Sequence, residues 1–307
     1  MIPREMVALM ERRRLVAEVR TASAIQALGV VDALAAGGVT TIEVSLTIPG
    51  AQEILTHLAP RRDVLVGAGA VLDPRQATEA ISCGARFIAS PICAQELIPV
   101  CRDANVACVL GALTPTEIIT AQRAGAEMVK LFPAEAIGGA AYVRALFRQL
   151  SFLSLQISGG FTPENMVEYL ALPIKTLALG SLLVPRALVE HGNWQAITMR
   201  ARAFVEYIAN PHVNAARFLT MMGVAPRPRV PQGAVVDPKA VVAAVPTINI
   251  PPAAAAAVAA AGGAVNGGQG SQGSQPGANV DPNASSGGFR PWDSRPVEMG
   301  DDEDWLR

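Results

Sequence analysis

Lysine is scarce in this sequence. Only three of its 25 basic residues are lysines, Lys130, Lys175 and Lys239, and the others are arginines. A guanidinium stays protonated in proteins, whereas a lysine amine can lose its proton and act as a nucleophile. Lys130 stands inside an apolar segment and is therefore a candidate nucleophile. Lys175 only precedes such a segment and Lys239 lies in a Pro/Gly-rich region, so neither competes for the role.

Cysteine and net charge are also low. The four cysteines lack the close pairing and the neighbouring histidines of a zinc site, and they are too few for a disulfide framework in 307 residues. We expect reduced thiols and no metal. The net charge of −1 gives no basic surface for nucleic acid or for an anionic membrane. We therefore expect no nucleic-acid partner and no membrane partner.

Long hydrophobic runs are missing as well. The first 14 residues mix charges with apolar residues at helical spacing and lack the apolar core of a secretory signal. The Ala-rich stretch 253–265 is too short to span the ~30 Å of a bilayer core. These two absences predict a cytoplasmic protein.

The composition changes near Pro226. Residues 226–307 contain 11 prolines and 11 glycines, a composition that buries too little apolar surface to offset chain entropy. We expect a folded domain over 1–210, a helical extension over 211–225 and a disordered tail over 226–307. The tail ends with Trp292 and Trp305 among acidic residues. This end is either a short binding motif for a protein partner or a solvated segment without one.

Before this tail, short apolar and β-prone runs alternate with segments of helical period, several of which end at glycine. Eight such runs predict an α/β protein with a closed parallel (β/α)8 TIM barrel. An open doubly wound sheet is the alternative, but its phosphate fingerprint GxGxxG is missing. The runs are 15–20, 40–45, 64–69, 87–92, 107–112, 128–133, 155–160 and 176–181.

Two of these runs contain a charged residue, Glu43 in TTIEVSL and Lys130 in MVKLFPAEA. A buried ion costs several kcal/mol unless it is paired, so each requires a partner. One interpretation is a structural ion pair that fixes strand order. The other is a Schiff-base lysine, whose amine attacks a ketone while the carboxylate moves protons. The scarcity of lysine favours the second interpretation.

Glycines follow the seventh and eighth runs, in SGG at 158–160 and LGS at 179–181. Barrels often bind phosphate through backbone N–H groups at this place, although such glycines also form plain tight turns. A phosphate site beside a nucleophilic lysine indicates a phosphorylated keto-sugar as substrate.

These segments together resemble the 2-dehydro-3-deoxy-6-phosphogluconate (KDPG) and 4-hydroxy-2-oxoglutarate (KHG) aldolase family of metal-independent, class I barrel aldolases. The resemblance spans residues 5 to about 208 and runs through AAGGVTTIEVSLTIPGA, VGAGAVLDP, RFIASPI, TPTEI, VKLFPAEAIGG, ISGGFTPEN and LGSLLVP. It implies cleavage of a 2-keto-4-hydroxy acid to pyruvate and an aldehyde, no cofactor, and a homotrimer. The aldehyde is glyceraldehyde 3-phosphate or glyoxylate.

The resemblance also implies roles for individual residues. Lys130 is the Schiff-base lysine and Glu43 the acid and base, while Arg20 holds a carboxylate or phosphate end of the substrate. The phosphate cradle comprises Gly159, Gly160, Gly180 and Ser181. The remaining substrate-binding positions are Thr47, Ala70, Pro91 and Phe132.

Several of these positions depart from the family pattern. Some members have arginine in place of Thr47. Most have threonine in place of Ala70, and the hydroxyl of that threonine hydrogen-bonds the substrate carboxylate. Losing such a hydrogen bond costs about 1.5–3 kcal/mol. The loop that usually reads SPG or SPH here has Ile92, and Leu110 replaces a usual proline. We expect an altered pyruvyl pocket.

The departures and the tail leave two alternatives to a plain aldolase. One is a barrel with little turnover that acts as a scaffold or sensor through its tail. The other is an active aldolase that is tethered to a partner by the terminal Trp-containing segment.

Overall fold

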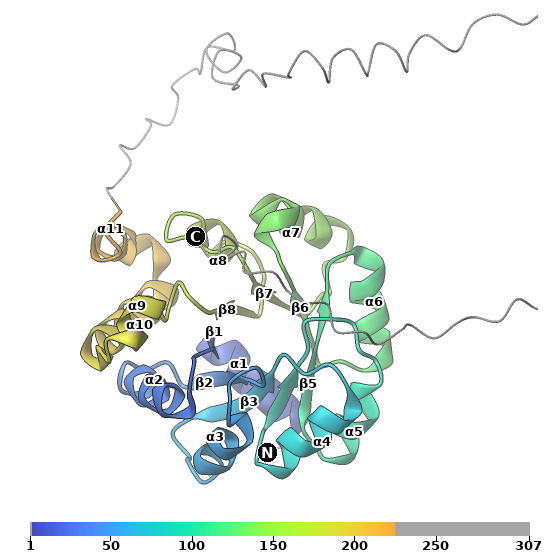
Figure 1. Cartoon of the computed structure of the whole chain (residues 1–307). Helices are drawn as coiled ribbons and strands as arrows, with labels where there is room; N and C mark the ends of the chain where they lie inside the picture. The colour runs from blue at the N-terminus through green and yellow to red at the C-terminus, as the bar shows by residue number, and fades with distance from the viewer. Residues whose placement is uncertain (1, 225–307) are drawn as a thin grey trace, which may run out of the picture. The chain divides into compact units, whose positions relative to one another are not determined.

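The computed structural model describes residues 2–224, and within this range parallel strands form a closed barrel surrounded by helices (Figure 1). Each strand pairs with the next along the chain, and β8 closes the barrel against β1. The predicted (β/α)8 barrel is thereby confirmed over the open sheet. The strands are β1 (Leu15–Val19), β2 (Thr41–Ser45), β3 (Leu65–Gly69), β4 (Phe87–Ala89), β5 (Ala107–Ala112), β6 (Met128–Leu131), β7 (Leu155–Ser158) and β8 (Thr176–Leu179).

Several strands end earlier than the apolar runs suggest. Strand β7 stops at Ser158 because Gly159 and Gly160 adopt left-handed backbone conformations, with φ of +91° and +84°. Strand β4 stops at Ala89, just before the turn that contains Pro91, a residue without a backbone N–H. The candidate residues at these ends therefore lie in the loops that follow the strands.

The helices begin and end at recognisable signals. Helix α6 starts after Thr114, whose hydroxyl accepts a hydrogen bond from the N–H of Glu117 while the Glu117 carboxylate accepts one from the N–H of Thr114. Pro115 occupies its first turn, and Gly125 ends it with φ of +111°. The helices are α1 (Pro3–Arg13), α2 (Ala24–Ala36), α3 (Ala51–Leu58), α4 (Pro74–Ser82), α5 (Leu97–Asp103), α6 (Pro115–Ala124), the 3-10 helix η1 (Glu135–Ile137), α7 (Gly139–Gln149), α8 (Met166–Leu170), α9 (Arg186–Glu190), α10 (Trp194–Ala209) and α11 (Pro211–Met221).

The core has two parts. The larger lies between the strands and the surrounding helices, and the smaller fills the inside of the barrel. Phe87 and Met128 are buried in the smaller part together with Met6 and Met10 of α1. Helix α1 therefore closes the end of the barrel at which the strands begin, and the site must open at the other end.

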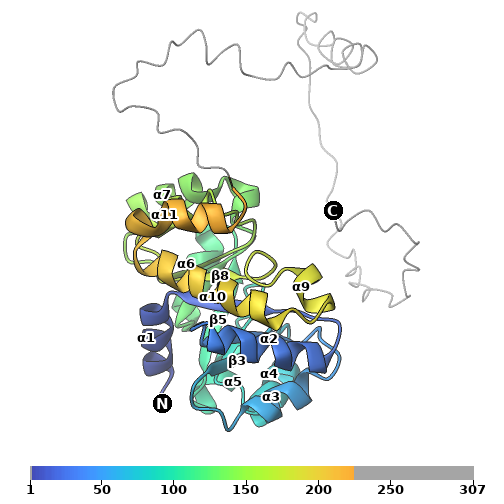
Figure 2. The same cartoon turned by 90° about the vertical axis from the view of Figure 1, so that its left-hand side faces the viewer.

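Helix α11 packs against α10, as both views show (Figures 1 and 2). The ring of Phe218 stacks on Tyr207 with centroids 4.1 Å apart and meets Phe204 edge-on at 4.9 Å. This helix falls inside the predicted extension 211–225. The predicted tail 226–307, with Trp292 and Trp305, lies outside the described residues, as does Lys239. Among residues 2–224, no helix has the length and apolar character to cross a membrane.

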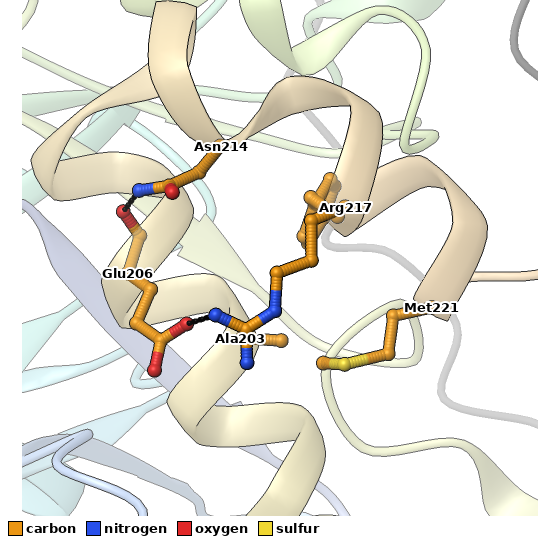
Figure 3. Close-up of a pocket in the computed structure, with 6 residues that line it drawn as sticks. Ala203, Glu206, Asn214, Arg217 and Met221 are labelled. Atoms are coloured by element: carbon orange, nitrogen blue, oxygen red, sulfur yellow. Dashed lines mark hydrogen bonds and ion pairs between the residues drawn. The ribbon is translucent and has the colours of Figure 1, made fainter.

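A shallow hollow lies between these two helices (Figure 3). Its polar groups are already paired: Arg217 Nη1 lies 3.1 Å from Glu206 Oε2, and Asn214 Nδ2 donates to the Glu206 carbonyl at 2.8 Å. The hollow thus serves the packing of α11 on α10 and is separate from the barrel opening.

Candidate active site

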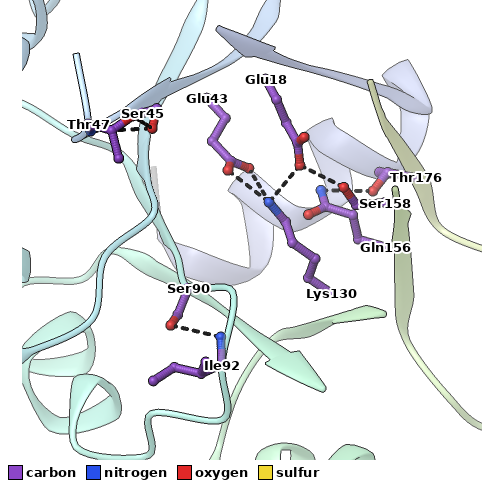
Figure 4. Close-up of polar contacts among 10 residues, drawn as sticks. All are labelled: Glu18, Glu43, Ser45, Thr47, Ser90, Ile92, Lys130, Gln156, Ser158 and Thr176. Atoms are coloured by element: carbon purple, nitrogen blue, oxygen red, sulfur yellow. Dashed lines mark hydrogen bonds and ion pairs between the residues drawn. The ribbon is translucent and has the colours of Figure 1, made fainter. Parts of the chain in front are cut away.

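Three charged side chains from three strands meet inside the barrel (Figure 4). The Nζ of Lys130 on β6 donates hydrogen bonds to both carboxylate oxygens of Glu43 on β2, at 2.8 and 2.9 Å. It also donates to Oε1 of Glu18 on β1 at 2.9 Å. The predicted pairing of Lys130 with Glu43 is present, and a second carboxylate joins it.

The alternation of side chains along a strand places these charges. On β6, Met128 points into the apolar interior, and Lys130, two residues further, points into the same interior one layer closer to the opening. Glu18 and Glu43 are direct neighbours in the register of β1 and β2. Because like charges side by side repel, this arrangement depends on the ammonium group between them.

The pKa values of the three groups shift in different directions. Burial lowers the pKa of Lys130, but the charges and hydrogen bonds of Glu43 and Glu18 outweigh it and hold this pKa above its ordinary value. Burial, together with the charge of Glu18, raises the pKa of Glu43 more than the charges of Lys130 and Arg20 and the hydrogen bond of Lys130 lower it. For Glu18, burial is outweighed by the charge and hydrogen bond of Lys130 together with the Ser158 hydrogen bond and the Arg20 charge, so its pKa is lowered. Glu43 is therefore the carboxylate that takes up a proton more readily.

Glu18 is a candidate site residue that the sequence analysis does not identify. It stands inside the apolar run LVAEVR, and a charge inside such a run was the signal that identified Glu43. Arg20 ends the same run, where the functional residues of a barrel are expected, and it is therefore the residue predicted from this strand. The Glu18 carboxylate also accepts a hydrogen bond from Ser158 Oγ at 2.9 Å, so this side chain is held from two directions.

Two glycines of the GAGA segment make room for larger side chains. A Cβ on Gly69 would overlap the Glu43 carboxylate, and a Cβ on Gly67 would overlap the ring of Phe87. Gly111, the register neighbour of Lys130, lies against the backbone of Pro91. These glycines allow a charged layer to fit inside a narrow barrel.

The other candidate residues follow the strands at the open end. Arg20 is exposed directly after β1, and its charge lowers the pKa of both carboxylates slightly further. Thr47 Oγ1 lies 2.8 Å from Ser45 Oγ after β2. Ala70 follows β3 with φ of +59°, a left-handed conformation that is strained for a residue with a Cβ.

Pro91 and Phe132 lie after β4 and β6. Ser90 Oγ accepts a hydrogen bond from the N–H of Ile92, which turns the chain at Pro91 and leaves the Ile92 side chain exposed (Figure 4). Phe132 is 40% exposed, and its ring lies against Gly159. The ring thus borders the loop after β7.

The loop after β7 is held by Glu135 of η1. Its Oε1 accepts hydrogen bonds from Asn165 Nδ2 at 2.7 Å and from Tyr169 Oη at 2.9 Å. Asn165 Nδ2 also donates to the carbonyl of Gly160 at 3.1 Å, and a Cβ on Gly160 would overlap Glu135. The backbone of Gly160 is therefore fixed beside the mouth.

The predicted set is brought together at one end of the barrel. Gly180 and Ser181 follow β8, so the predicted positions lie at, or just after, the carboxyl ends of the strands, except Glu43 in the middle of β2. Lys175 precedes β8 at the opposite end, where it pairs with Glu11 of α1 at 3.1 Å. The four cysteines are free thiols.

A closed parallel barrel with a buried lysine among carboxylates at its open end fits a class I aldolase, an enzyme that works through a Schiff base. The family model "KDPG and KHG aldolase" matches residues 6–200. The chain belongs to this family of lyases.

Known proteins agree with this assignment. The 2-dehydro-3-deoxy-phosphogluconate aldolase of Pseudomonas aeruginosa is 35% identical over 183 residues, which cover 59% of this chain and 83% of the relative. The KHG/KDPG aldolase of Escherichia coli is 34% identical over 181 residues, covering 59% and 85%. The KDPG aldolase of Legionella pneumophila, solved with pyruvate captured as a covalent carbinolamine, is 30% identical with a TM-score of 0.61 and covers 64% and 96%.

Proposed function

We propose that this chain cleaves a 2-keto-4-hydroxy acid, KDPG or KHG, to pyruvate and an aldehyde through a Schiff base on Lys130. The observation that carries the proposal is the burial of the Lys130 amine, whose side chain is 6% exposed, between two carboxylates. Burying these charged groups costs folding free energy, and a catalytic role for the amine explains why they are buried.

The first step joins the substrate to the amine. Lys130 transfers a proton to the Glu43 carboxylate, which lies 2.8 Å away, and the neutral amine attacks the C2 carbonyl carbon. The carbinolamine hydroxyl then takes a proton back and leaves as water, so that C2 and the nitrogen form a protonated imine.

The second step breaks the C3–C4 bond. The C4 hydroxyl gives its proton to a carboxylate while the C3–C4 electron pair moves toward the iminium, which leaves an enamine and a free aldehyde. Glu43 returns a proton to C3 of the enamine, and water then releases pyruvate and restores the amine. Glu43 thus serves as both acid and base.

The remaining residues bind the two ends of the substrate. Gly159, Gly160, Gly180 and Ser181 form the phosphate cradle, because glycine lets an anion approach the backbone closely. The pyruvyl half is surrounded by Thr47, Ala70, Pro91 and Phe132, and Arg20 holds an anionic end. The methyl group of Ala70 offers no hydrogen bond to the pyruvyl carboxylate.

Borohydride trapping tests the proposal. Incubation with pyruvate and borohydride is expected to add one reduced pyruvyl group to the full-length chain, located at Lys130 by peptide mass spectrometry. Lys130→Ala removes the adduct, and Lys175→Ala, which alters the lysine at the other end of the barrel, keeps it. If the wild-type chain forms no adduct, the lysine and the carboxylates are only a structural ion pair.

We also propose a homotrimer, which the family resemblance implies, and a cytoplasmic location, which the expectation of reduced thiols supports. Sedimentation of the purified chain tests the trimer. The scaffold and tethering alternatives depend on residues 226–307 and remain predictions. Removal of these residues with unchanged kinetics and loss of a co-purifying protein would assign the tail to binding.

A further inference from the structure

The active site contains one carboxylate more than the amine requires. Glu43 contacts Lys130 Nζ with both of its oxygens, so that one carboxylate balances the single positive charge of the ammonium group. Glu18 adds a second negative charge at 2.9 Å from the same nitrogen. The need to pair Lys130 therefore does not account for Glu18.

Glu18 also differs from Glu43 in what surrounds it. Its Oε1 accepts both of its hydrogen bonds, one from Lys130 and one from Ser158. No described residue donates a hydrogen bond to its Oε2. The side chain of Glu18 is 24% exposed, compared with 7% for Glu43. One carboxylate oxygen of Glu18 is thus held in place and the other is free to meet a ligand.

The free oxygen faces the end of β8. A Cβ placed on Gly180 would lie 3.7 Å from Glu18 Oε2, and Gly180 has no such atom. Arg20 lies two residues further along at the mouth, but no ion pair joins it to Glu18 in the described part of the chain. The negative charge of Glu18 therefore points toward Gly180, just after β8, without an ion-pair partner on that side among the described residues.

This position lies along the path of the substrate. The inference rests on the proposed function, in which C2 bonds to Lys130 and the far end of the substrate lies at the cradle after β7 and β8. The atoms from C4 onward, which become the aldehyde, must then pass between Lys130 and Gly180. Glu18 stands between these two residues.

We propose that Glu18 determines which aldehyde half the enzyme accepts. Its carboxylate accepts hydrogen bonds from hydroxyl groups of the aldehyde half and rejects an aldehyde half that carries a carboxylate on C4. KDPG has a hydroxylated chain at this place, whereas KHG has a carboxylate bonded directly to C4. Two carboxylates held a few ångströms apart in a partly buried site repel each other strongly. The wild-type enzyme therefore prefers KDPG.

The test compares kcat/KM for the two substrates by a coupled assay of pyruvate release with the full-length chain. The pyruvyl half is the same in both substrates, so an effect of Glu18 on the amine cancels in the ratio of KDPG to KHG. Glu18→Gln is expected to shift this ratio toward KHG by about tenfold or more. Glu18→Asp, which keeps the charge, shifts it less. As a control, Glu53→Gln removes an exposed carboxylate from the first turn of α3 and should leave the ratio of KDPG to KHG unchanged.

Each outcome decides between the alternatives. An unchanged ratio in Glu18→Gln overturns the inference. Equal loss of turnover on both substrates also overturns it, because Glu18 would then act in the step that both share. If instead the proposed function is wrong, the wild-type chain releases no pyruvate from either substrate. Trapping of pyruvate by Glu18→Gln verifies that the variant is folded.

Discussion

Glu18 and Glu43 are register neighbours on β1 and β2, and both accept hydrogen bonds from the amine of Lys130. Two carboxylates on adjacent strands repel each other, so each depends on the same cation for its stability. The three side chains consequently behave as one electrostatic unit, and a change in one alters the proton affinity of the other two.

Replacing Lys130 with methionine is expected to abolish turnover and to destabilise the fold by about 3–5 kcal/mol at neutral pH, because two buried carboxylates lose their partner. In the variant these carboxylates bind protons more tightly in the folded state than in the unfolded state. Its stability therefore rises as the pH falls toward the ordinary pKa of glutamate. Urea unfolding at pH 7 and at pH 5 measures both effects. Lys175→Met, which breaks only the partly exposed pair with Glu11, should cost about 0–1 kcal/mol.

Glu43→Gln is expected to lower kcat by about 10²–10⁴-fold, since the amide cannot take a proton from the amine or return one to C3. The KM should change much less, because the pyruvyl contacts remain. Steady-state kinetics of pyruvate release provide the measurement, with Glu53→Gln as the matched control. A kcat within threefold of the wild type would contradict the role of Glu43.

The pH dependence of Schiff-base formation should respond to Glu18. In the wild-type chain the two carboxylates raise the pKa of Lys130, so the rate of trapping pyruvate rises toward alkaline pH. Glu18→Gln removes one negative charge beside the amine, which lowers its pKa and moves the rising limb of this profile to lower pH. Initial rates of adduct formation across the pH range, measured by mass spectrometry, check the direction. A shift to higher pH would rule out the electrostatic coupling.

Gly69→Ala is expected to displace the Glu43 carboxylate, because the added Cβ would overlap it. Turnover should fall by more than tenfold. Gly67→Ala is the matched comparison, since its Cβ would overlap the ring of Phe87 in the apolar interior. That variant should lose about 1–3 kcal/mol of stability through overpacking. Its turnover per folded molecule should stay close to that of the wild type. Kinetics and thermal unfolding of both variants separate the two effects.

Ala70→Gly should stabilise the fold by about 1 kcal/mol, because glycine adopts the left-handed conformation at this position without strain. Asn105, with φ of +55°, offers a control, since asparagine tolerates this conformation better and Asn105→Gly should gain less. Ala70→Thr should bind pyruvate more tightly and unfold at a lower temperature, because a branched side chain increases the strain. Thermal unfolding and the KM of each variant test both expectations.

The barrel could be predicted from the sequence because its signal is repeated. Each apolar run is followed by a helical segment, and local signals such as the Thr114 and Glu117 capping box mark where the helices begin. Lys130 and Glu43 could also be found locally, since a charge inside a buried strand is unusual. The same rule would have found Glu18.

Other parts of the site depend on contacts that no local pattern encodes. The overlap of a Gly69 side chain with Glu43 arises between neighbouring strands and depends on their register. The hydrogen bonds that link Glu135 to Gly160 through Asn165 connect η1 with the loop after β7. Sequence alone gives the type of each residue, while such relationships follow from the closure of the barrel.

Helix α1 determines the order in which the two products leave. Since Met6 and Met10 close one end of the packed barrel interior, a substrate approaches Lys130 from the opposite end, where the strands stop. In the proposed reaction the keto acid bonds to Lys130 next to the packed interior, and the aldehyde fragment lies closer to the mouth. The aldehyde must therefore depart before pyruvate, and in the reverse reaction pyruvate must enter first.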